Sequence, residues 1–442
     1  MPRAINRRTF LTASGLLLGA PSVFAAPAAG GDEWPQYRGP QRDGTWQEKG
    51  IIERFSAPEI PVKWRAPVGN GYSGPTVAGG RVYVTDRVTE PEQQERVHCF
   101  DAKTGAKVWT QVYPCQYAGF AYTNGPRASV TVHQGRAYTL GSMAHFRCFD
   151  AATGKVLWSH DCAPEYGVRM PDFGIASHPF IDEDRVVVQL GGTNGACVVA
   201  FDQKTGKERW RALEDRAGYA PPILVEQMGR RVLVVWTGDH VAGLDPKTGV
   251  MLWGYPFKSP QTLDAITSPS VSGDRLFVSG WHSGALELRL LPDRMAVEKV
   301  WHQQGPNERN TLAFHTMFTA PLFIGDEIYG IDTYGELRCL NAKTGERVWS
   351  SDAVGPHVRN LGVHFTRHGG EVWIFNEKGE LIISRISRAG YQELSRALLV
   401  RPTRGQFTRR GEGVAWAPPA FAYRHVFARN DEELICANLS AT

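Results

Sequence analysis

Cys99-Phe-Asp101-Ala-Lys-Thr104-Gly105-Ala-Lys-Val-Trp109 is the first copy of an eleven-residue pattern that repeats along the chain. A second copy, Cys148-Phe-Asp150-Ala-Ala-Thr153-Gly154-Lys-Val-Leu-Trp158, keeps the same small, Asp, Thr, Gly and Trp positions. Six more copies follow, and the third position of the eight falls at Asp101, Asp150, Asp202, Asp245, Asp293, Asn341, Ile386 and Asn438. The steps are 43 to 52 residues, a period typical of a β-propeller with four short strands per blade.

Each conserved type in the pattern has a physical role in a β-hairpin. The Asp side chain accepts hydrogen bonds from backbone N–H groups in the turn between the third and fourth strands. The Gly supplies a positive φ that closes this turn with a bulge. The Trp lies at the blade surface, where it can bury roughly 150–250 Å² against the neighbouring blade. We therefore interpret the tryptophans as contacts between blades and not as sugar-binding platforms.

Two internal copies depart from the pattern. The fifth reads Leu291, Asp293 and Trp301 without Thr-Gly, and the seventh runs from Ser384 to Leu394 without a tryptophan. Both keep their place in the period, so both are predicted to be blades.

The eighth copy starts at Cys436 and the sequence ends four residues after Asn438. A spare strand with a tryptophan, Trp64, lies upstream of the first full blade. We predict an all-β, eight-bladed propeller of four-stranded antiparallel blades over residues 34–442. Its N-terminal strand completes the C-terminal blade, which hides the sheet edges that would otherwise pair with other chains.

The first 25 residues have the features of a signal peptide. Arginines at positions 3, 7 and 8 precede a short apolar stretch and a small-residue exit near Ala25, which is the layout of an export signal. The pair Arg7-Arg8 followed by Thr9-Phe10-Leu11 resembles the twin-arginine motif. The stretch is too short for a membrane span of about 20 residues. We expect a periplasmic or secreted protein with a flexible leader at 26–33.

The charge of the chain excludes one class of partner. The formal net charge is +4, and removal of the signal peptide takes away three arginines and no acids. A nearly neutral chain without a basic run does not predict nucleic-acid binding. We expect a monomer without a membrane span.

The repeats resemble the pyrrolo-quinoline quinone (PQQ) type, whose tryptophan-docking motif is the pattern quoted above, and the resemblance covers about residues 34–440. The opening Trp34-Pro35-Gln-Tyr37-Arg-Gly39-Pro40 resembles the N-terminal segment of such propellers. The family implies either a PQQ-dependent alcohol or sugar dehydrogenase or a propeller without cofactor, such as the barrel-assembly scaffold of the outer membrane. This chain has no adjacent cysteine pair and no Cys-x-x-Cys-His haem site, two features found among the dehydrogenases.

The segments that enter the innermost strands are expected to line the mouth of the central channel, the usual working surface of a rigid scaffold. They are 70–72, 124–127, 172–174, 218–219, 264–266, 315–318, 359–361 and 412–416. If the protein is an enzyme, a carboxylate takes the proton of a substrate hydroxyl while a hydride leaves for the quinone. The candidates for this base are Asp264, Glu412 and Asp172. Arg127 and Arg359 would neutralise cofactor carboxylates, and the other predicted cofactor contacts are Tyr72, Tyr219, His315, Asn360 and Trp416.

The chain has seven cysteines, so at least one of them cannot form a disulfide within the chain. Cys99, Cys148, Cys339 and Cys436 share one repeat position and are interpreted as small core residues. Cys115 and Cys162 follow the fourth strands of adjacent blades, and an oxidising compartment permits a bridge between them. Because no histidines show metal-ligand spacing, no metal site is predicted.

Three hypotheses for function stay open. The first is an exported propeller that binds a small ligand, a glycan or a protein at its channel mouth. The second is a quinoprotein oxidoreductase with PQQ and a divalent cation. The third is an envelope assembly scaffold.

Overall fold

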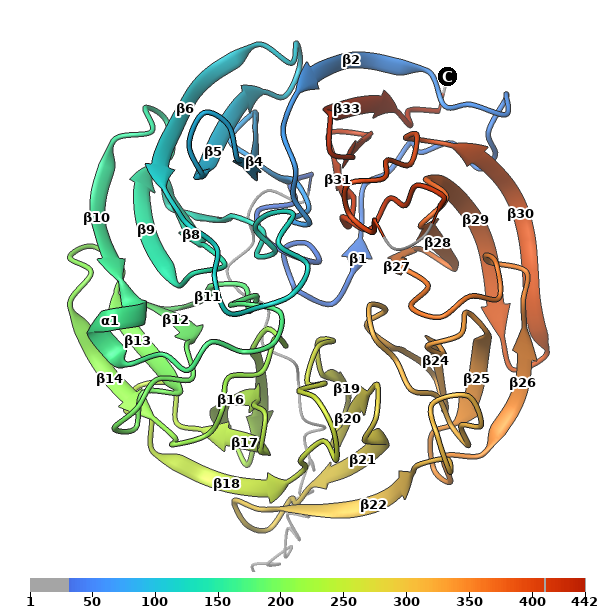
Figure 1. Cartoon of the computed structure of the whole chain (residues 1–442). Helices are drawn as coiled ribbons and strands as arrows, with labels where there is room; N and C mark the ends of the chain where they lie inside the picture. Colours follow the sequence, from blue (N-terminus) through green and yellow to red (C-terminus); the bar gives the residue numbers. More distant parts are fainter. Residues whose placement is uncertain (1–31, 409–410, 442) are drawn as a thin grey trace, which may run out of the picture.

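Eight antiparallel sheets stand around a central axis in the computed structural model, which describes residues 32–408 and 411–441 (Figure 1). The expected all-β, eight-bladed propeller is confirmed. The predicted signal peptide and most of the predicted leader lie outside the described residues. Among the described residues, no helix is long and apolar enough to cross a bilayer.

The first four blades follow one another along the chain, each from innermost to outermost strand. Blade 1 is β3 (Thr76–Ala78), β4 (Arg81–Val88), β5 (Gln94–Asp101) and β6 (Lys107–Pro114). Blade 2 is β7 (Thr131–His133), β8 (Arg136–Leu140), β9 (His145–Asp150) and β10 (Val156–Asp161), followed by helix α1 (Cys162–Tyr166). Blade 3 is β11 (Phe180–Asp182), β12 (Arg185–Gln189), β13 (Val198–Asp202) and β14 (Glu208–Ala212). Blade 4 is β15 (Ile223–Gln227), β16 (Arg230–Trp236), β17 (His240–Leu244) and β18 (Met251–Pro256).

The second half of the ring continues in the same order. Blade 5 is β19 (Ser270–Ser272), β20 (Arg275–Gly280), β21 (Gly284–Leu290) and β22 (Val297–Gln303). Blade 6 is β23 (Leu322–Ile324), β24 (Glu327–Ile331), β25 (Leu337–Asn341) and β26 (Arg347–Ser351). Blade 7 is β27 (Val363–His368), β28 (Glu371–Asn376), β29 (Glu380–Ser387) and β30 (Gly390–Leu398), and blade 8 is β31 (Ala420–Ala422), β32 (His425–Arg429), β33 (Glu433–Asn438) and β2 (Val62–Pro67).

The ring closes as the sequence predicts. Strand β2 pairs antiparallel with β33, and Trp64 lies opposite Cys436. Figure 1 shows the blue N-terminal strand as the outermost strand of the red C-terminal blade. The same cross-strand pair of a small residue and Trp recurs as Cys99–Trp109 in blade 1.

Five of the docking tryptophans join two blades in the same way. The indole Nε1 of Trp109 donates to the Ala151 carbonyl of blade 2 at 3.1 Å. Its ring lies against Gly154, where a Cβ would come within 2.6 Å of the indole, and φ there is +74°. The motif glycine is therefore required twice, for the backbone conformation and for the close approach of the ring. Trp64, Trp158, Trp210 and Trp301 contact Gly105, Gly206, Gly249 and Gly345 alike.

The degenerate fifth repeat alters the hydrogen bond made by the docking tryptophan of blade 4. Because the turn of blade 5 lacks Thr-Gly, Trp253 donates to the Gln227 side chain at 3.0 Å instead of to a turn carbonyl. Gln227 in turn donates to the carbonyls of Leu291 and Ala296 in that turn. A buried glutamine thus replaces the direct contact between the two blades.

The register expected for two degenerate repeats is wrong. In blade 5 the residue opposite Trp301 is Glu287 and not Leu291, because the hairpin is four residues longer than in the first copies. In blade 7 the bulge lies between Ile383 and Ser384, and Ser395 takes the tryptophan position in place of Leu394. Without the motif's turn residues the sequence pattern does not fix the hairpin length.

The register of blade 5 leaves Glu287 in the core. This side chain is fully buried, its two oxygens have no hydrogen-bond partner among the described residues, and the nearest cation is Arg275 at 4.0 Å. Burial raises the pKa of Glu287 to about 7. The folded protein therefore holds a proton there that the unfolded chain releases near pH 4.5.

Glu287 should make the stability fall as the pH rises. Between about pH 4.5 and 7 the folded state binds more protons than the unfolded state, so the free energy of unfolding decreases through this window, by about 3 kcal/mol. Glu287→Gln removes the ionisation. Thermal denaturation gives the Tm of the variant minus that of wild type at each pH. This difference should be about 3–4 °C larger at pH 8 than at pH 5. The half-exposed Glu298 of the same hairpin provides the control Glu298→Gln, and pH profiles of wild type and Glu287→Gln that run parallel would contradict the assignment.

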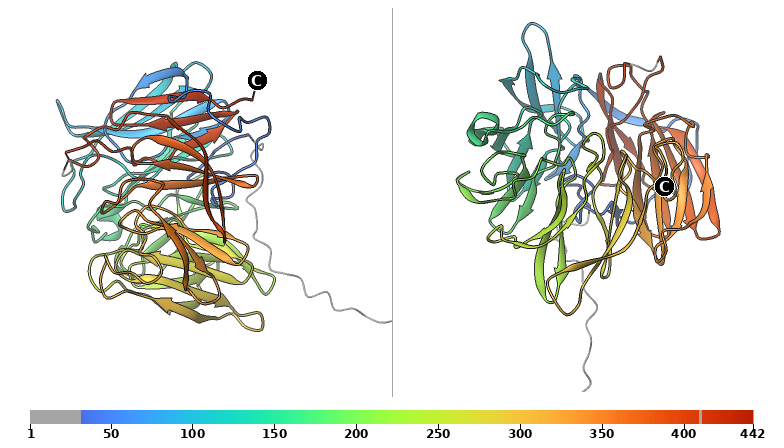
Figure 2. Two further views of the ribbon diagram at one scale, coloured as in Figure 1. Left: turned by 90° about the vertical axis from the view of Figure 1, so that its right-hand side faces the viewer. Right: turned by 60° about the horizontal axis from the view of Figure 1, so that its bottom comes forward.

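An N-terminal segment, residues 34–46, crosses one end of the channel before β2 begins. Trp34 exchanges two backbone hydrogen bonds with Val77 of blade 1, and β1 (Thr45–Trp46) adds a parallel strand to β27 of blade 7. Arg42 is buried and donates to the carbonyls of Pro179 and His178 in blade 3. Figure 2 shows this blue segment inside the ring of blades. It ties together blades that are far apart around the ring.

The bridge between Cys115 and Cys162 that an oxidising compartment would permit is not formed in the structure. All seven cysteines are free and buried. The Cys115 sulfur lies 3.5 Å from His145 Nδ1, whereas Cys162 packs in the core of blades 2 and 3 at the start of α1. The interpretation of Cys99, Cys148, Cys339 and Cys436 as core residues is confirmed by their burial.

Candidate functional site

The eight segments that enter the innermost strands converge on one cavity of about 180 Å³. Each contributes at least one side chain. Its walls are formed by Tyr37, Tyr72, Tyr122, Arg127, Phe173, Ala176, His178, Tyr219, Ile266, Met317, Phe318, Asn360, His364, Trp416 and Pro418. Five of the predicted site residues line it, namely Tyr72, Arg127, Tyr219, Asn360 and Trp416. The cavity is smaller than the roughly 300–1,000 Å³ of most ligand pockets, so it suits one ring.

Aromatic faces dominate the part of the wall beside residues 401–408 and 411–416, which precede blade 8. The ring of Trp416 lies 4.9 Å from those of Phe318 and Phe407. Gln406 holds this loop in place, because its side chain accepts from the Trp416 backbone at 2.7 Å and donates to the Gly71 carbonyl at 3.1 Å. The Tyr72 hydroxyl donates to the Gln406 carbonyl at 3.0 Å. The aromatic wall is therefore built from blades 1, 6 and 8 together.

Arg127 carries the charge of the cavity. Its guanidinium donates to the carbonyls of Ala121 and Tyr122 at 3.0 and 2.6 Å and to that of Gly125 at 3.2 Å. It also lies 5.0 Å above the ring of Tyr72. Burial lowers the pKa of Arg127 from its ordinary value, but arginine stays protonated at neutral pH. The arginine thus holds the mouth loop with most of its donors.

The two histidines of the wall are neutral. His178 stacks on Tyr37 with ring centroids 3.9 Å apart, and its Nδ1 accepts from the Ser129 backbone. His364 Nε2 donates to the Trp416 carbonyl at 2.8 Å. Burial lowers the pKa of His178 well below its ordinary value and that of His364 to about 4. Arg127 is therefore the one charged group among the fifteen lining residues.

Asn360 contributes a polar side chain to the cavity wall. It is 5% exposed, and its Oδ1 has no hydrogen-bond partner among the described residues. Its backbone has φ of +64°, held by the hydrogen bond from its N–H to the Thr333 carbonyl at 2.8 Å. Buried acceptors without a partner are rare in folded proteins because each costs about 1–3 kcal/mol.

The three predicted catalytic carboxylates do not line the cavity. Asp264 is buried and caps a turn, with one oxygen accepting from the backbones of His282 and Ser283 at 2.7 and 2.8 Å. Asp172 accepts from the Thr262 hydroxyl, and Glu412 is exposed. Their catalytic role stays a prediction, and the geometry shows no carboxylate on the described cavity wall that could act as a base.

Two predicted cofactor contacts also lie away from the cavity wall. Arg359 pairs with Glu308 at 2.8 Å and lies 4.8 Å above the Trp281 ring. His315 is buried, its Nδ1 donates to the Trp281 carbonyl at 2.8 Å, and burial lowers its pKa. Both side chains secure the loops of blades 5 and 6.

Sequence reasoning missed the floor of the cavity. Tyr37 comes from the segment that crosses the channel, 35 residues before Tyr72, the next wall residue along the chain. The motif Trp34-Pro35-Gln-Tyr37 was the available signal. Gly39 allows the sharp return after Tyr37, since its φ is +80° and a Cβ would touch the Trp34 ring at 2.9 Å. Beyond this floor, toward the β7–β8 hairpin, lies a larger cavity of about 600 Å³.

The cavity wall does not fit PQQ with a divalent cation. That cofactor carries several carboxylates, and the wall offers one arginine whose donors already bind backbone carbonyls. None of the fifteen lining residues, all within the described part of the chain, is acidic, so a hard cation such as Ca²⁺ lacks its carboxylate ligands. No step through the quinone is derived from this site.

Comparison with known proteins places the fold in a family. The family model described as outer membrane protein assembly factor BamB, of PQQ-type repeats, matches residues 55–111 and 93–351. The chain belongs to the PQQ-repeat β-propeller family. The two matches together span blades 1 to 6, where most of the tryptophan-docking motifs lie.

The relatives within this family divide between two activities. A 1-butanol dehydrogenase (quinone) of Thauera butanivorans is 35% identical over 156 residues, which is 30% of this chain and 23% of the relative. An outer membrane protein assembly factor BamB of Burkholderia pseudomallei is 24% identical over 300 residues, which is 66% of this chain and 59% of the relative. The crystal structure of BamB from Moraxella catarrhalis has a TM-score of 0.57 at 16% identity, covering 87% of this chain and 98% of that one.

These matches do not establish an activity for this chain. The chain spans about a quarter of the length of the butanol dehydrogenase and about three fifths of the Burkholderia assembly factor. The structural likeness is at low identity and shows the fold alone. Function must therefore be argued from the cavity.

Proposed function

We propose that this protein is an exported binding propeller whose channel-mouth cavity takes a small ring-bearing ligand, with the terminal ring of a glycan as the best-fitting class. The observation that carries the proposal is a cavity of the size of one ring, with aromatic walls and the polar side chains of Asn360 and Arg127 among them. A sugar ring offers both an apolar face for the aromatic wall and hydroxyls for these polar side chains.

The charge of the cavity limits the class of ligand further. Arg127 is the one charged group on the wall and has no acidic neighbour there. Its field opposes a cation, although the aromatic faces alone would favour one. A ligand that is neutral or carries a single negative charge suits the site, so sugars and sugar acids should bind better than amino sugars.

We propose further that the protein is exported and monomeric. The twin-arginine pattern at Arg7-Arg8 supports export, and so do relatives whose names place them in outer-membrane assembly. A role as an assembly scaffold is the second hypothesis that the family supports, but among the described residues no particular contact surface favours it over the cavity.

The test uses Trp416 as its reporter. This residue is 6% exposed in the cavity wall, so a bound ring should change its fluorescence. A panel of neutral sugars, sugar acids, amino sugars and PQQ with Ca²⁺ is titrated against the full mature chain. Saturable binding of a neutral or acidic sugar supports the proposal, whereas tight binding of PQQ with Ca²⁺, or of no sugar in the panel, would overturn it.

Asn360→Gly should weaken ligand binding about tenfold, the loss of one hydrogen bond of about 1.4 kcal/mol. Glycine tolerates the positive φ at this position, so the fold is kept. The matched control is Arg359→Ala, the neighbouring residue that pairs with Glu308 outside the cavity, and it should bind as wild type. Equal affinities of wild type and Asn360→Gly in the same titration would show that the amide is not a ligand contact.

A further inference from the structure

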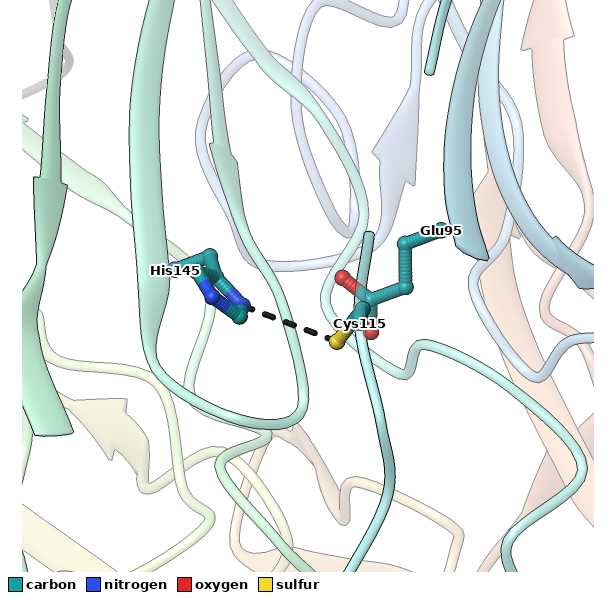
Figure 3. Close-up of side chains that lie close together, drawn as sticks. All are labelled: Glu95, Cys115 and His145. Carbon is teal, nitrogen blue, oxygen red and sulfur yellow. Dashed lines mark hydrogen bonds between the residues drawn. The ribbon is translucent and has the colours of Figure 1, made fainter. Parts of the chain in front are cut away.

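Three metal-ligating side chains meet between blades 1 and 2, apart from the channel-mouth cavity. Glu95 lies on β5, Cys115 follows directly after β6, and His145 is the first residue of β9. One oxygen, the sulfur and one ring nitrogen of the three lie within 4.8 Å of one another. Figure 3 shows the His145 ring and the Glu95 carboxylate on either side of the Cys115 sulfur.

The donor set and its spacing resemble one edge of a zinc tetrahedron. The Cys115 Sγ is 3.5 Å from His145 Nδ1. Zn–S of about 2.3 Å and Zn–N of about 2.0–2.1 Å at a tetrahedral angle give an edge of about 3.6 Å. Thiolate, imidazole and carboxylate together are ligands that zinc accepts, whereas calcium and magnesium prefer oxygen alone.

A second layer of contacts orients two of the three donors. His145 Nε2, on the far side of the ring, lies 3.9 Å from the Asp161 carboxylate. This distance is longer than a hydrogen bond, but it places the carboxylate on the side of the ring opposite Nδ1, where a carboxylate lies in carboxylate–histidine–zinc sites. The Glu95 carboxylate accepts from the hydroxyls of Tyr113, at 2.6 Å, and Tyr117. Glu95 and Cys115 are 1% and 2% exposed, so both are fixed before any ion arrives.

The burial of Cys115 argues against a role as a catalytic thiol. A nucleophilic cysteine must reach substrate, and the Cys115 side chain is covered by the core of blades 1 and 2. A metal ion needs only a narrow path and gains from fixed ligands. We propose that Glu95, Cys115 and His145 bind one Zn²⁺ ion that joins blade 1 to blade 2, with one coordination position left for water. On binding, the Cys115 thiol releases its proton and the sulfur forms the bond to zinc.

The experiment loads the mature chain, purified without a polyhistidine tag, with Zn²⁺ or with Co²⁺ as a spectroscopic probe. One zinc per chain after dialysis, and a thiolate-to-cobalt charge-transfer band with the visible bands of a tetrahedral site, are expected. His145→Asn replaces a partly exposed side chain and should fold, and it should abolish both signals, as should Cys115→Ser. Cys162→Ser, at a buried cysteine outside the cluster, is the matched control and should keep them.

Asp161→Asn tests the positioning of His145. This carboxylate is about half exposed and would not touch the ion, and its loss should lower zinc affinity about 10- to 100-fold while the cobalt charge-transfer band persists at saturation. Zinc should also raise the Tm of wild type and not that of His145→Asn. Absence of the charge-transfer band in wild type, or its persistence in His145→Asn, would overturn the proposal.

Discussion

Trp109→Ala is expected to lower the free energy of unfolding by about 3–5 kcal/mol. The side chain is 8% exposed, and its ring fills the space between Gly154 and Tyr83. Its removal leaves a cavity between blades 1 and 2 and deprives the Ala151 carbonyl of its donor. For a chain of this length the loss corresponds to a fall in Tm of about 3–6 °C, measured by thermal denaturation.

Two variants divide the effect into its parts. Trp109→Phe keeps most of the ring and removes the N–H, so it should lose about 1 kcal/mol for the hydrogen bond and somewhat more for the smaller ring. Val108→Thr changes the preceding side chain, which is 43% exposed, and should stay within about 0.5 kcal/mol of wild type. If Trp109→Ala were as stable as Val108→Thr, the tryptophans would not hold the blades together.

Arg429→Met is expected to destabilise the protein by about 4 kcal/mol or more, because it removes a donor from two buried carbonyls and one partly buried carbonyl, at about 1–3 kcal/mol each. Arg429 is fully buried at the end of β32. It donates to the carbonyls of Asn430 at 3.0 Å, Thr85 at 2.7 Å, and Gly69. Those groups belong to blade 8, to blade 1 and to the connection between β2 and β3, so this one guanidinium spans the seam where the ring closes.

The loss should be local as well as large. Hydrogen exchange in Arg429→Met should increase first in β2 and β33, because these strands close the ring, while blades 3 to 6 keep their protection. Arg385→Met, at a side chain that is 64% exposed on β29, is the control and should leave exchange and Tm unchanged. Uniform exchange across all blades in Arg429→Met would show that the seam has no separate stability.

Much of the ring could be predicted because the docking motif combines its determinants in eleven residues. The turn carboxylate, the glycine and the tryptophan of each repeat specify one hairpin and its contact with the next blade. Asp101, for example, accepts from the Thr104 backbone and hydroxyl at 2.8 Å each. Where these residues are missing, as in blade 5, the hairpin length is free, and the prediction placed Leu291 where Glu287 lies.

The channel mouth was predictable as a set of segments but not as a set of side chains. Whether a residue such as Asp264 faces the cavity depends on which backbone N–H groups the neighbouring loop presents to it. Here those of His282 and Ser283 turn its carboxylate into the protein. Arg359 likewise turns to Glu308, while Asn360 beside it faces the cavity.

The sequence by itself determined the number of blades, their order and the closure through Trp64, because each depends on contacts that a short repeated motif specifies locally. The tertiary structure alone decided that Tyr37 forms the cavity floor and that Glu95, Cys115 and His145 meet between two blades. These residues are brought together by the curvature of the ring and by a segment that crosses it. Such distances depend on the packing of all eight sheets, and no spacing along the chain encodes them.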